Sequence, residues 1–323
     1  MPKKKVLGLS FPVLAGILFL VFALLSISLI TGPLGKSLIG DLGLPTWLSV
    51  PRPAPELPAE VVFHFFGFPI TNSIIGAWVT MAFLVIFSFI VTRRMKVVPG
   101  RLQGIFEFLF GWLYSFCQRV AGEQNGRRFF PIVATIFLFV AFNAWLSLIP
   151  GFGSITVTTP DGHHVHLLRG ANTDINMPLA LALVSFIFVE FFGLKSLGVR
   201  YLGKFINVGG FFKSLALIAR GRVKAGFSGL ITGFIQIFVG ILEALSELVR
   251  IVSFTFRLFG NMTAGEILLL IAAFLIPWVF ALPFYGLELL VGFVQALIFS
   301  GLTLVFLTLA VAHHGEQHES VGH

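Results

Sequence analysis

The chain has 323 residues, of which 57% are hydrophobic and 11% are charged, and it carries a formal net charge of +8. A soluble domain has about 25% charged residues, because charge covers its surface. The composition therefore excludes a water-soluble enzyme, a disordered chain and a disulfide scaffold, and the lone Cys117 cannot form an internal disulfide. It leaves a membrane protein with several spans, and the basic residues in short loops indicate membrane topology instead of nucleic-acid binding.

Six apolar runs are long enough to cross a bilayer, whose core of about 30 Å needs roughly 20 helical residues. The chain order of these runs is 8–32, 70–92, 129–151, 176–194, 227–276 and 284–312. Prolines at 277 and 283 interrupt the last stretch, so we expect a tilted helical hairpin over 227–312. The predicted fold class is an all-α polytopic membrane protein with about six transmembrane helices.

The first run follows three lysines and allows two interpretations, a cleaved signal peptide or a retained span. Its apolar core exceeds the roughly 7–15 residues of a signal, and no A-x-A-like cleavage site follows, which favours a retained span. Residues 48–60 contain four prolines and are predicted to be an extended external linker. We therefore divide the chain into residues 1–69, a span with a linker, and a membrane domain at 70–323.

Lysine and arginine counts predict the orientation of the spans. Segments 93–128 and 195–224 hold seven basic residues each, whereas 33–69 holds two and 152–175 holds one. The two rich segments are expected in the cytoplasm, which places both termini there as well. Residues 101–121 mix apolar and charged side chains and are expected to form an interfacial helix.

The run 227–276 contains five charged residues: Glu243, Glu247, Arg250, Arg257 and Glu266. A charge at the bilayer centre costs at least about 2.5 kcal/mol, so each one is either compensated or useful. At ~100° per residue, Glu243, Arg250 and Arg257 share one helix face, and Asn261 follows one turn later. A helix of about 50 residues is ~75 Å long, so it is either strongly tilted or broken near Gly260.

A structural alternative exists for part of this set, because Glu243 and Glu247 could simply pair with Arg250. Arg257 has no such explanation, since it is the last basic residue of the chain and lies deep in the longest apolar region. The final run adds Glu288 and Gln295, seven residues apart on one face. Carboxyl groups accept and release protons, whereas arginine stays protonated, so this pattern suits proton transfer.

Residues 256–266, Phe-Arg-Leu-Phe-Gly-Asn-Met-Thr-Ala-Gly-Glu, closely resemble the L-R-L-F-G-N-M-x-A-G-E signature of subunit a of F-type ATP synthases. Further stretches agree in the family's order at residues 98–103, 143–150, 173–176 and 295–299. The similarity spans about residues 65–312. The chain is therefore identified as similar to the proton-channel subunit of that family.

The resemblance implies a role for each residue that matches the family. Arg257 is the essential arginine that faces a ring of c subunits. The non-cytoplasmic half-channel is implied to contain Asn261, Glu266, Glu288 and Gln295, with Asp174 and Asn176 near its entrance. The cytoplasmic half-channel is implied to contain Glu243 and Ser246.

The resemblance also implies partners and a location. The partners are the c-subunit ring, the b-subunit peripheral stalk, the soluble F1 sector, transported protons and the lipid bilayer, with no nucleic acid. The subunit does no bond chemistry on its own, and no cofactor or metal is implied. The location is a bacterial plasma membrane.

The sequence contains three weaker signals. Residues 198–204 match the start of a phosphate-binding loop, but Phe205 stands where Ser or Thr is needed, so we expect no ATP binding. Histidines at 163, 164 and 166 and in the tail are interpreted as solvated residues and not as metal ligands. Glu190 is assigned either to the channel or to the membrane interface.

Two other functions remain open at this point. The first is an independent secondary transporter for a small anion, with Arg257 as the substrate-binding group. Such transporters usually repeat their spans about the midplane, and no repeat is present. The second is a purely structural scaffold, which the charges within the apolar runs disfavour.

Overall fold

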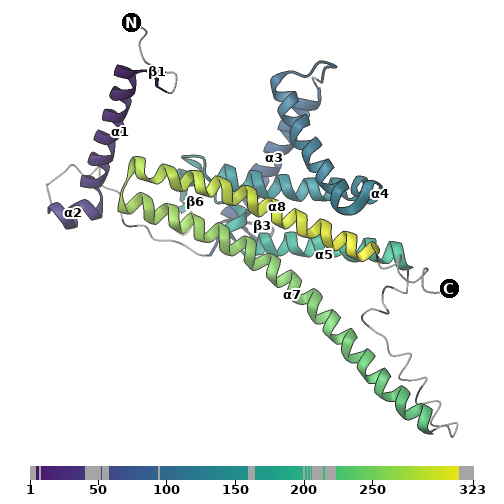
Figure 1. Cartoon of the computed structure of the whole chain (residues 1–323). Coiled ribbons are helices and arrows are strands. Elements are labelled where there is room, and N and C mark those ends of the chain that lie inside the picture. The colour runs from purple at the N-terminus through teal and green to yellow at the C-terminus, as the bar shows by residue number, and fades with distance from the viewer. Residues whose placement is uncertain are drawn as a thin grey trace. The chain divides into compact units, whose positions relative to one another are not determined.

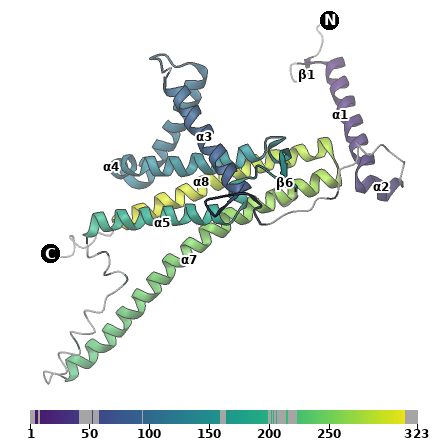
Figure 2. The same cartoon turned by 180° about the vertical axis from the view of Figure 1, so that it is seen from behind.

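The structure is a computed structural model that describes residues 5–6, 9–40, 52, 58–93, 95–158, 164–198, 201, 203, 205, 214 and 223–312. The helices, shown in Figure 1 and from behind in Figure 2, are α1 (Phe11–Thr31), α2 (Pro33–Ile39), α3 (Asn72–Arg93), α4 (Arg101–Ser147), α5 (Asn176–Leu197), α7 (Val223–Leu275) and α8 (Leu282–Ala312). Within the described residues, six of these are long and apolar enough to cross a membrane. The predicted all-α polytopic architecture is confirmed.

Three short antiparallel hairpins accompany the helices. They pair β1 (Lys5–Val6) with β2 (Leu9–Ser10), β3 (Val61–Phe65) with β4 (Phe68–Thr71), and β5 (Thr156–Thr158) with β6 (His164–His166). Short 3-10 turns are η2 (Phe152–Ser154), η3 (Ala171–Thr173) and η5 (Trp278–Ala281). The turn η5 joins α7 to α8, at the position where the two prolines predicted the hairpin to reverse.

The chain forms two compact units, each built from three chain segments. The first unit contains Met1–Trp78, Asn143–Asp174 and Gly260–Val294. The second unit contains Val79–Phe142, Ile175–Phe259 and Gln295–His323. Four long helices therefore contribute residues to both units, and each unit is described by itself below.

In the first unit, the end of α7 and the start of α8 pack closely where α7 presents a glycine. A Cβ atom added at Gly265 would collide with the Glu288 carboxyl group. The indole nitrogen of Trp145 donates a hydrogen bond of 3.0 Å to the carbonyl of Leu289, which ties α4 to α8. This packing places Glu288 inside the unit, where it is only 6% exposed.

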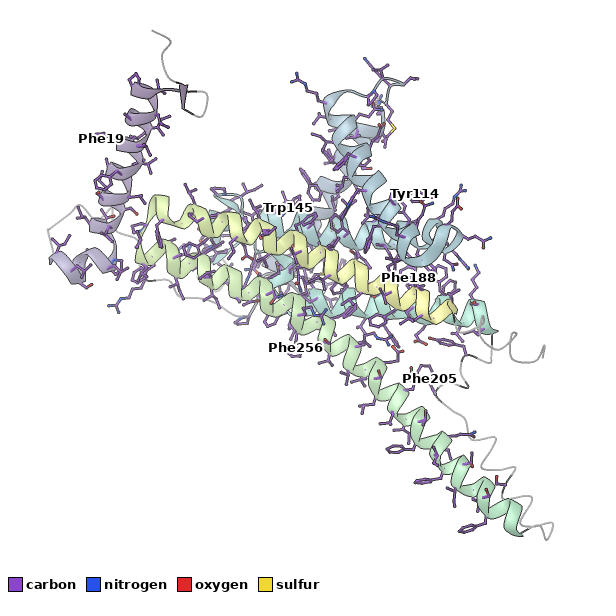
Figure 3. All side chains as sticks on the ribbon, viewed as in Figure 1. Phe19, Tyr114, Trp145, Phe188, Phe205 and Phe256 are labelled. Atoms are coloured by element: carbon purple, nitrogen blue, oxygen red, sulfur yellow. The ribbon has the colours of Figure 1, made fainter. Side chains whose placement is uncertain are left out.

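Helix α1 also belongs to the first unit, and it is attached through its carboxyl-terminal end. The Ser28 hydroxyl donates to the carbonyl of Pro277. The rest of α1 is largely exposed, and Phe19 points away from the helix with 74% of its surface accessible (Figure 3). An apolar helix with so little protein around it is suited to a lipid environment.

In the second unit, an apolar core forms where α4, α5 and α8 meet. Its most buried members are Cys117, Phe129, Val133, Val189, Leu304 and Leu307. Helix α7 joins this packing through Phe254, whose ring lies 4.9 Å from that of Phe299. The side chains that face this core are almost all apolar, so the charged groups described below are exceptions that have specific partners.

Two helix boundaries differ from the expectations. Helix α7 continues through Gly260 without interruption, so the alternative of a break near that residue is wrong. Helix α4 contains a non-helical residue, Gly122 (φ 79°, ψ 167°), which separates the expected helix at 101–121 from a second helix. That second helix ends at Ser147, before the expected limit of the span at residue 151. The N–H groups of Leu148 and Ile149 bond to carbonyls three residues back, and Pro150 has no N–H with which to continue the helix.

The β3–β4 hairpin was not predicted. Its two-residue turn consists of Phe66 (φ 49°) and Gly67 (φ 83°), and Phe65 pairs with Phe68 across it. Positive φ at both central residues is the geometry that matches the twist of a tight hairpin. The hairpin leads directly into α3 and positions the start of that helix, where the site described next begins.

Candidate functional site

A first group of polar side chains, here called the Glu266 cluster, contains Glu60, Ser73, Arg169, Asp174 and Glu266, all from the first unit. Its central contact is an ion pair of 3.3 Å between Arg169 Nη2 and Glu266 Oε2. The Arg169 side chain is 10% exposed, whereas that of Glu266 is 39% exposed. The carboxylate therefore remains open to its surroundings while its cationic partner is enclosed.

The loop that carries Arg169 is fixed by the other members of this cluster. Glu60 Oε2 accepts a hydrogen bond of 2.9 Å from the backbone N–H of His166 and one of 3.4 Å from Asn72 Nδ2. Asp174 is buried and accepts a hydrogen bond of 2.5 Å from the Ser73 hydroxyl. Two acids thus tie the segment at 164–174 to the start of α3.

The residues predicted for the non-cytoplasmic half-channel are divided between the units. Asp174, Asn261, Glu266 and Glu288 belong to the first unit, and Asn176 and Gln295 belong to the second. Glu288 and Gln295 are buried, Glu266 is half-buried, and Asn261 and Asn176 are exposed. The first unit thus contains three of the predicted acids, Asp174, Glu266 and Glu288.

A second group, here called the Arg250 cluster, contains Glu190, Tyr201, Glu247 and Arg250, all from the second unit. Arg250 Nη1 forms an ion pair of 2.5 Å with Glu247 Oε2, one helical turn earlier on α7. The Arg250 guanidinium lies 3.7 Å from the centre of the Phe306 ring, which is a cation–π contact. Glu247 is 4% exposed, so this charge is compensated within its own chain.

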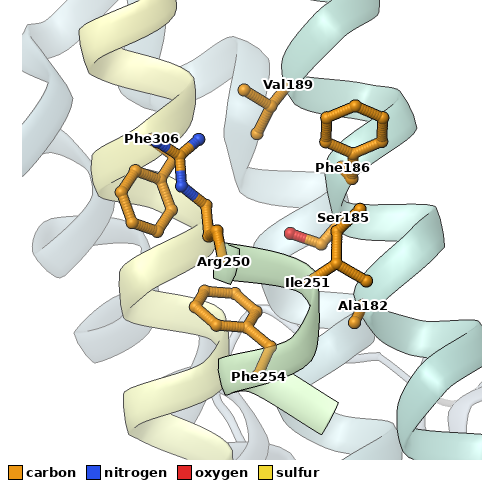
Figure 4. A pocket seen from close by; sticks show the side chains of 8 residues that line it. All are labelled: Ala182, Ser185, Phe186, Val189, Arg250, Ile251, Phe254 and Phe306. Carbon is orange, nitrogen blue, oxygen red and sulfur yellow. The ribbon is translucent and has the colours of Figure 1, made fainter. Parts of the chain in front are cut away.

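Arg250 also borders a small pocket between α5, α7 and α8 (Figure 4). Figure 4 shows the Arg250 side chain rising beside Phe306, with the α5 residues on the other side. The pocket is lined by Ala182, Ser185, Phe186, Val189, Arg250, Ile251, Phe254 and Phe306. Ser185 and Arg250 are its only polar side chains, and the Ser185 hydroxyl is within hydrogen-bond distance, 2.8 Å, of that of Thr303.

Tyr201 extends this cluster beyond the end of α5. Its hydroxyl donates a hydrogen bond of 3.1 Å to Glu190 Oε1, and its ring packs against Gly193, where a side chain would collide with it. Burial and, next, the nearby Glu190 charge raise the pKa of the Tyr201 phenol well above its usual range. Glu190 therefore contacts the buried Tyr201. Its assignment to the channel or to the membrane interface stays a prediction.

The remaining predicted residues lie on α7 in the second unit. Glu243 is half-buried, and Ser246 is exposed. Arg257 is also exposed, and the structure gives it one hydrogen bond, of 3.5 Å, from Nη2 to the hydroxyl of Ser253. Its neighbour Phe256 is 57% exposed and lies on the outer side of the helix (Figure 3).

The structure describes only some of the histidines and only part of the 198–204 segment. Within the β5–β6 hairpin, Nδ1 of His164 lies within hydrogen-bond distance, 3.1 Å, of the Thr158 hydroxyl. His163, the tail histidines and several residues of the 198–204 segment lie outside the described residues. In the part of the chain that the structure describes, no group of three or more His, Cys, Asp or Glu side chains is arranged to hold a metal ion.

Comparison with known proteins assigns the chain to a family. The family model described as ATP synthase A chain matches residues 74–308. The chain belongs to this family. Curated relatives named ATP synthase subunit a include one from Desulfosudis oleivorans, 33% identical over 241 residues, which cover 74% of this chain and 88% of the relative. Another, from Gloeobacter violaceus, is 31% identical over 76% of this chain and 86% of the relative.

The similarity extends over almost the full length of some relatives. The ATP synthase subunit a of Moorella thermoacetica is 27% identical over 259 residues, which cover 80% of this chain and 98% of the relative. The matched residues 74–308 include every predicted site residue, whereas Glu60 and Ser73 of the Glu266 cluster precede them. With six apolar helices of sufficient length, this member of the ATP synthase A chain family is a multi-pass integral membrane protein.

Sequence reasoning missed four residues that the clusters contain. Arg169 had been counted only as a loop charge, and Glu60, Ser73 and Tyr201 had not been considered. A signal was present for Arg169, because it is the single basic residue of segment 152–175 and stands five residues before Asp174. No signal in the sequence links it to Glu266, which is 97 positions away.

Proposed function

We propose that this chain is the proton-translocating stator subunit of a rotary F-type ATP synthase. In this proposal it provides two offset half-channels and an arginine that faces a ring of c subunits. Membership of the ATP synthase A chain family supports the general assignment. The observation that carries the detailed one is the environment of Arg257.

Arg257 is a permanent charge on an apolar helix, and among the described residues its hydrogen bond is the one of 3.5 Å to the Ser253 hydroxyl. Isolated charges in the bilayer are expensive, so an exposed guanidinium there requires a partner from another molecule. The same helix exposes large apolar side chains, which include Phe238, Leu245, Val249, Val252 and Phe256. An arginine within an exposed apolar surface fits a neighbouring apolar protein that brings a carboxylate to the same depth.

A ring of c subunits supplies such a carboxylate. Each ring carboxyl group is neutral while it faces lipid, because a charge there is unfavourable. Beside Arg257 it can ionise, since an opposite charge favours the charged form. Because arginine does not release its proton, it attracts the carboxylate without itself relaying protons.

The two half-channels are assigned to two sets of polar residues. Asn261, Glu266, Glu288 and Gln295 line the non-cytoplasmic path, and Asp174 and Asn176 lie near its entrance. Glu243 and Ser246 line the cytoplasmic path. Protons that enter by one path leave by the other only after the ring has turned, and the membrane potential contributes about 2.3 kcal/mol per charge per 100 mV to that rotation.

The proposal also specifies partners and placement. The chain assembles with the c ring, the b-subunit peripheral stalk and, through the complex, the F1 sector. It lies in a bacterial plasma membrane, with both termini in the cytoplasm. The sequence segments 93–128 and 195–224 support this orientation because they carry seven basic residues each.

The decisive experiment replaces Arg257 with alanine in the assembled ATP synthase. We expect coupled ATP synthesis and ATP-driven proton pumping to be abolished while the soluble sector still hydrolyses ATP. Arg257→Lys keeps the charge and is the matched variant, although it has one nitrogen in place of a planar fork. Normal coupled synthesis in Arg257→Ala membranes would contradict the proposal.

A further inference from the structure

The β3–β4 hairpin of the first unit exposes an apolar face. In an antiparallel ladder, directly paired residues point to the same side, and so do residues two apart on one strand. One face of the hairpin therefore consists of two cross-strand pairs, Phe63 with Ile70 and Phe65 with Phe68. Phe65 and Phe68 are 60% and 74% exposed. A sheet face that is turned to water is normally polar, so this face requires a cover that the described residues do not supply.

The turn of the hairpin adds a further apolar side chain. Phe66 is 90% exposed, and its ring packs edge-on against that of Phe65, with 4.7 Å between the two ring centroids. Its backbone has a φ of 49°, an unusual conformation for a bulky residue. The first central position of a turn with two positive φ angles favours Asn or Asp. The chain thus places an aromatic ring at the tip where the backbone favours a polar residue.

The base of the hairpin is fixed to the unit. The backbone N–H of Asn72 donates to the carbonyl of Glu60 at 3.0 Å, and the Glu60 carboxylate accepts a hydrogen bond of 2.9 Å from the backbone N–H of His166. Val62, near the base, is buried. Helix α3 begins at Asn72, directly after the last residue of β4, so the base holds the hairpin at the start of this helix.

The position of this base indicates that lipid surrounds the tip. Helix α3 is one of the helices that are long and apolar enough to cross a membrane, so its first residue lies near one surface of the bilayer. Strand β4 has four residues, which span about 13 Å at ~3.3 Å per residue. The polar headgroup layer on one side of a bilayer is roughly 5–8 Å thick. A hairpin of this length can therefore reach the hydrocarbon from the end of a span.

Two further observations favour lipid over a protein partner. The exposed apolar surface continues from the hairpin into the first two turns of α3, where Trp78 is exposed. Residues 61–71 contain no Asp, Glu, Lys or Arg, so the hairpin lacks the charged groups that commonly form the polar rim of a protein interface.

The β5–β6 hairpin of the same unit provides a contrast. Strand β6 lies next to β3. The exposed face of β5–β6 consists of two polar cross-strand pairs, Thr156 with His166 and Thr158 with His164. Of two neighbouring hairpins, one thus exposes hydroxyl and imidazole groups and the other exposes phenyl rings. This difference fits water around the first hairpin and lipid around the second.

We propose that the β3–β4 hairpin is an interfacial membrane anchor whose phenyl rings insert into the bilayer beside the start of α3. Phenyl groups gain free energy on leaving water and need no hydrogen-bond partner, so the acyl region of the lipid is the ligand. Because the hairpin carries no Lys or Arg, insertion depends on buried apolar area and not on anionic headgroups. The anchor requires only that the chain lies in a membrane, and not the proton path proposed above.

The test measures the depth of the tip in the complete ATP synthase, reconstituted in phosphatidylcholine liposomes. A small fluorophore, bimane, is attached to Phe66→Cys in a complex whose other accessible cysteines are replaced, while the buried Cys117 stays. Thr156→Cys on the polar hairpin is the matched control. Two quenchers are compared, iodide on both sides of the membrane and phosphatidylcholine with a nitroxide near the top of its acyl chain. We expect the lipid nitroxide to quench the label at 66 about threefold more strongly than the label at 156, and iodide to quench it about threefold less.

Two results would overturn the anchor. If iodide quenches the label at 66 as strongly as the label at 156, the tip lies in water. If neither quencher reaches the label at 66, another protein covers the tip and lipid is not its ligand. Should the Phe66→Cys complex fail to assemble, Phe68→Cys reports from the same apolar face and is subject to the same two criteria.

A second set of variants tests whether the phenyl rings drive insertion, with the label at Phe68→Cys as the reporter. Phe66→Asn supplies the Asn-Gly pair that this turn favours, so the hairpin folds while the ring at its tip is lost. We expect lipid quenching to fall to about half, because less apolar area enters the bilayer. Phe66→Trp keeps an aromatic ring and should retain the quenching. Equal quenching with Phe66 and with Phe66→Asn means that the base alone sets the depth, which contradicts the anchor.

Two controls separate this proposal from electrostatic binding and from the proposed function. Replacement of half of the phosphatidylcholine by anionic phosphatidylglycerol should leave the quenching at 66 unchanged, and a strong increase would contradict insertion by apolar area. Arg257→Ala should also leave it unchanged, because the depth of the hairpin does not depend on proton transport. Failure of the anchor is thereby distinguishable from failure of the proton path.

Discussion

The Glu266 cluster and the Arg250 cluster each hold an arginine against a glutamate, but they do so by different means. Arg169 and Glu266 are 97 residues apart, and loops bring them together. Arg250 and Glu247 are three residues apart on one helix, beneath the Phe306 ring. The side chain of the first carboxylate is 39% exposed and that of the second 5%, so the first is open to its surroundings while the second is enclosed by its own chain.

Arg257 differs from both of these arginines in the partner that the described residues give it. Arg169 and Arg250 each find a carboxylate within their own unit, at 3.3 Å and 2.5 Å respectively. Arg257 has a hydroxyl contact of 3.5 Å and is exposed beside large apolar residues. An arginine that the fold leaves in this state is the one expected to act on another subunit.

Among the variants that test the difference between the two clusters, Glu247→Ala is expected to have the largest effect on assembly. Removing one partner of a buried ion pair leaves Arg250 uncompensated, which costs about 3 kcal/mol, less whatever the Phe306 contact recovers. We expect markedly less subunit in the assembled complex and a lower temperature of release, measured by native electrophoresis after a heat series. The double variant Glu247→Leu/Arg250→Met replaces both charges and should restore assembly.

The double variant also decides between the two interpretations of this pair. If it assembles and supports proton pumping at the parental rate, Glu247 and Arg250 are structural contacts. If it assembles and does not pump, the pair belongs to the cytoplasmic path. A Glu247→Ala protein that assembles as well as the parent contradicts the claim that the pair is buried and mutually dependent.

A smaller effect, on proton conduction and not on assembly, is expected for Gly265→Ala in the first unit. The new methyl group collides with the Glu288 carboxyl, which is the far end of a flexible side chain, so the carboxyl moves and the fold survives. We expect normal assembly and about tenfold slower passive proton conduction, which corresponds to about 1.4 kcal/mol. Gly286→Ala is the matched control, since a Cβ there meets no atom within 4 Å.

Shortening the displaced side chain tests the cause. Gly265→Ala/Glu288→Asp removes one methylene from the acid and should recover part of the lost conduction. If Gly265→Ala conducts like the parent, Glu288 does not need its observed position, and its place in the non-cytoplasmic path is contradicted.

The sequence predicted local features of the fold well and long-range ones poorly. The apolar runs identified the long helices, because a run of about 20 apolar residues has few other stable forms in a bilayer. The two prolines located the turn between α7 and α8. The continuity of α7 through Gly260 was left open, because glycine lowers helix stability by only about 1 kcal/mol and packing decides the outcome.

The candidate site shows the same division. The pairing of Glu247 with Arg250 was foreseen as an alternative, because helical spacing makes residues three apart neighbours. The ion pair of Arg169 with Glu266 was not foreseen, because it depends on how the 164–174 segment, tied to Glu60 and Ser73, meets α7. The Phe66–Gly67 turn of the β3–β4 hairpin was not recognised, because it lies within a run of aromatic residues.

The smallest effect is expected for Tyr201→Phe, which removes the hydroxyl that donates to Glu190. The loss of one hydrogen bond to a charged acceptor should destabilise the second unit by about 1 kcal/mol at neutral pH. The pKa of the Tyr201 phenol is raised in the folded protein above its value of about 10 in the unfolded chain. Its contribution to the free energy of unfolding is therefore fully present below about pH 10 and decreases as the pH rises above that value. Thermal unfolding of the detergent-solubilised complex between pH 8 and 11 should therefore show a steeper alkaline decline in the parent than in Tyr201→Phe. Parallel declines in the two proteins would mean that Tyr201 is not held as its contact with Glu190 indicates.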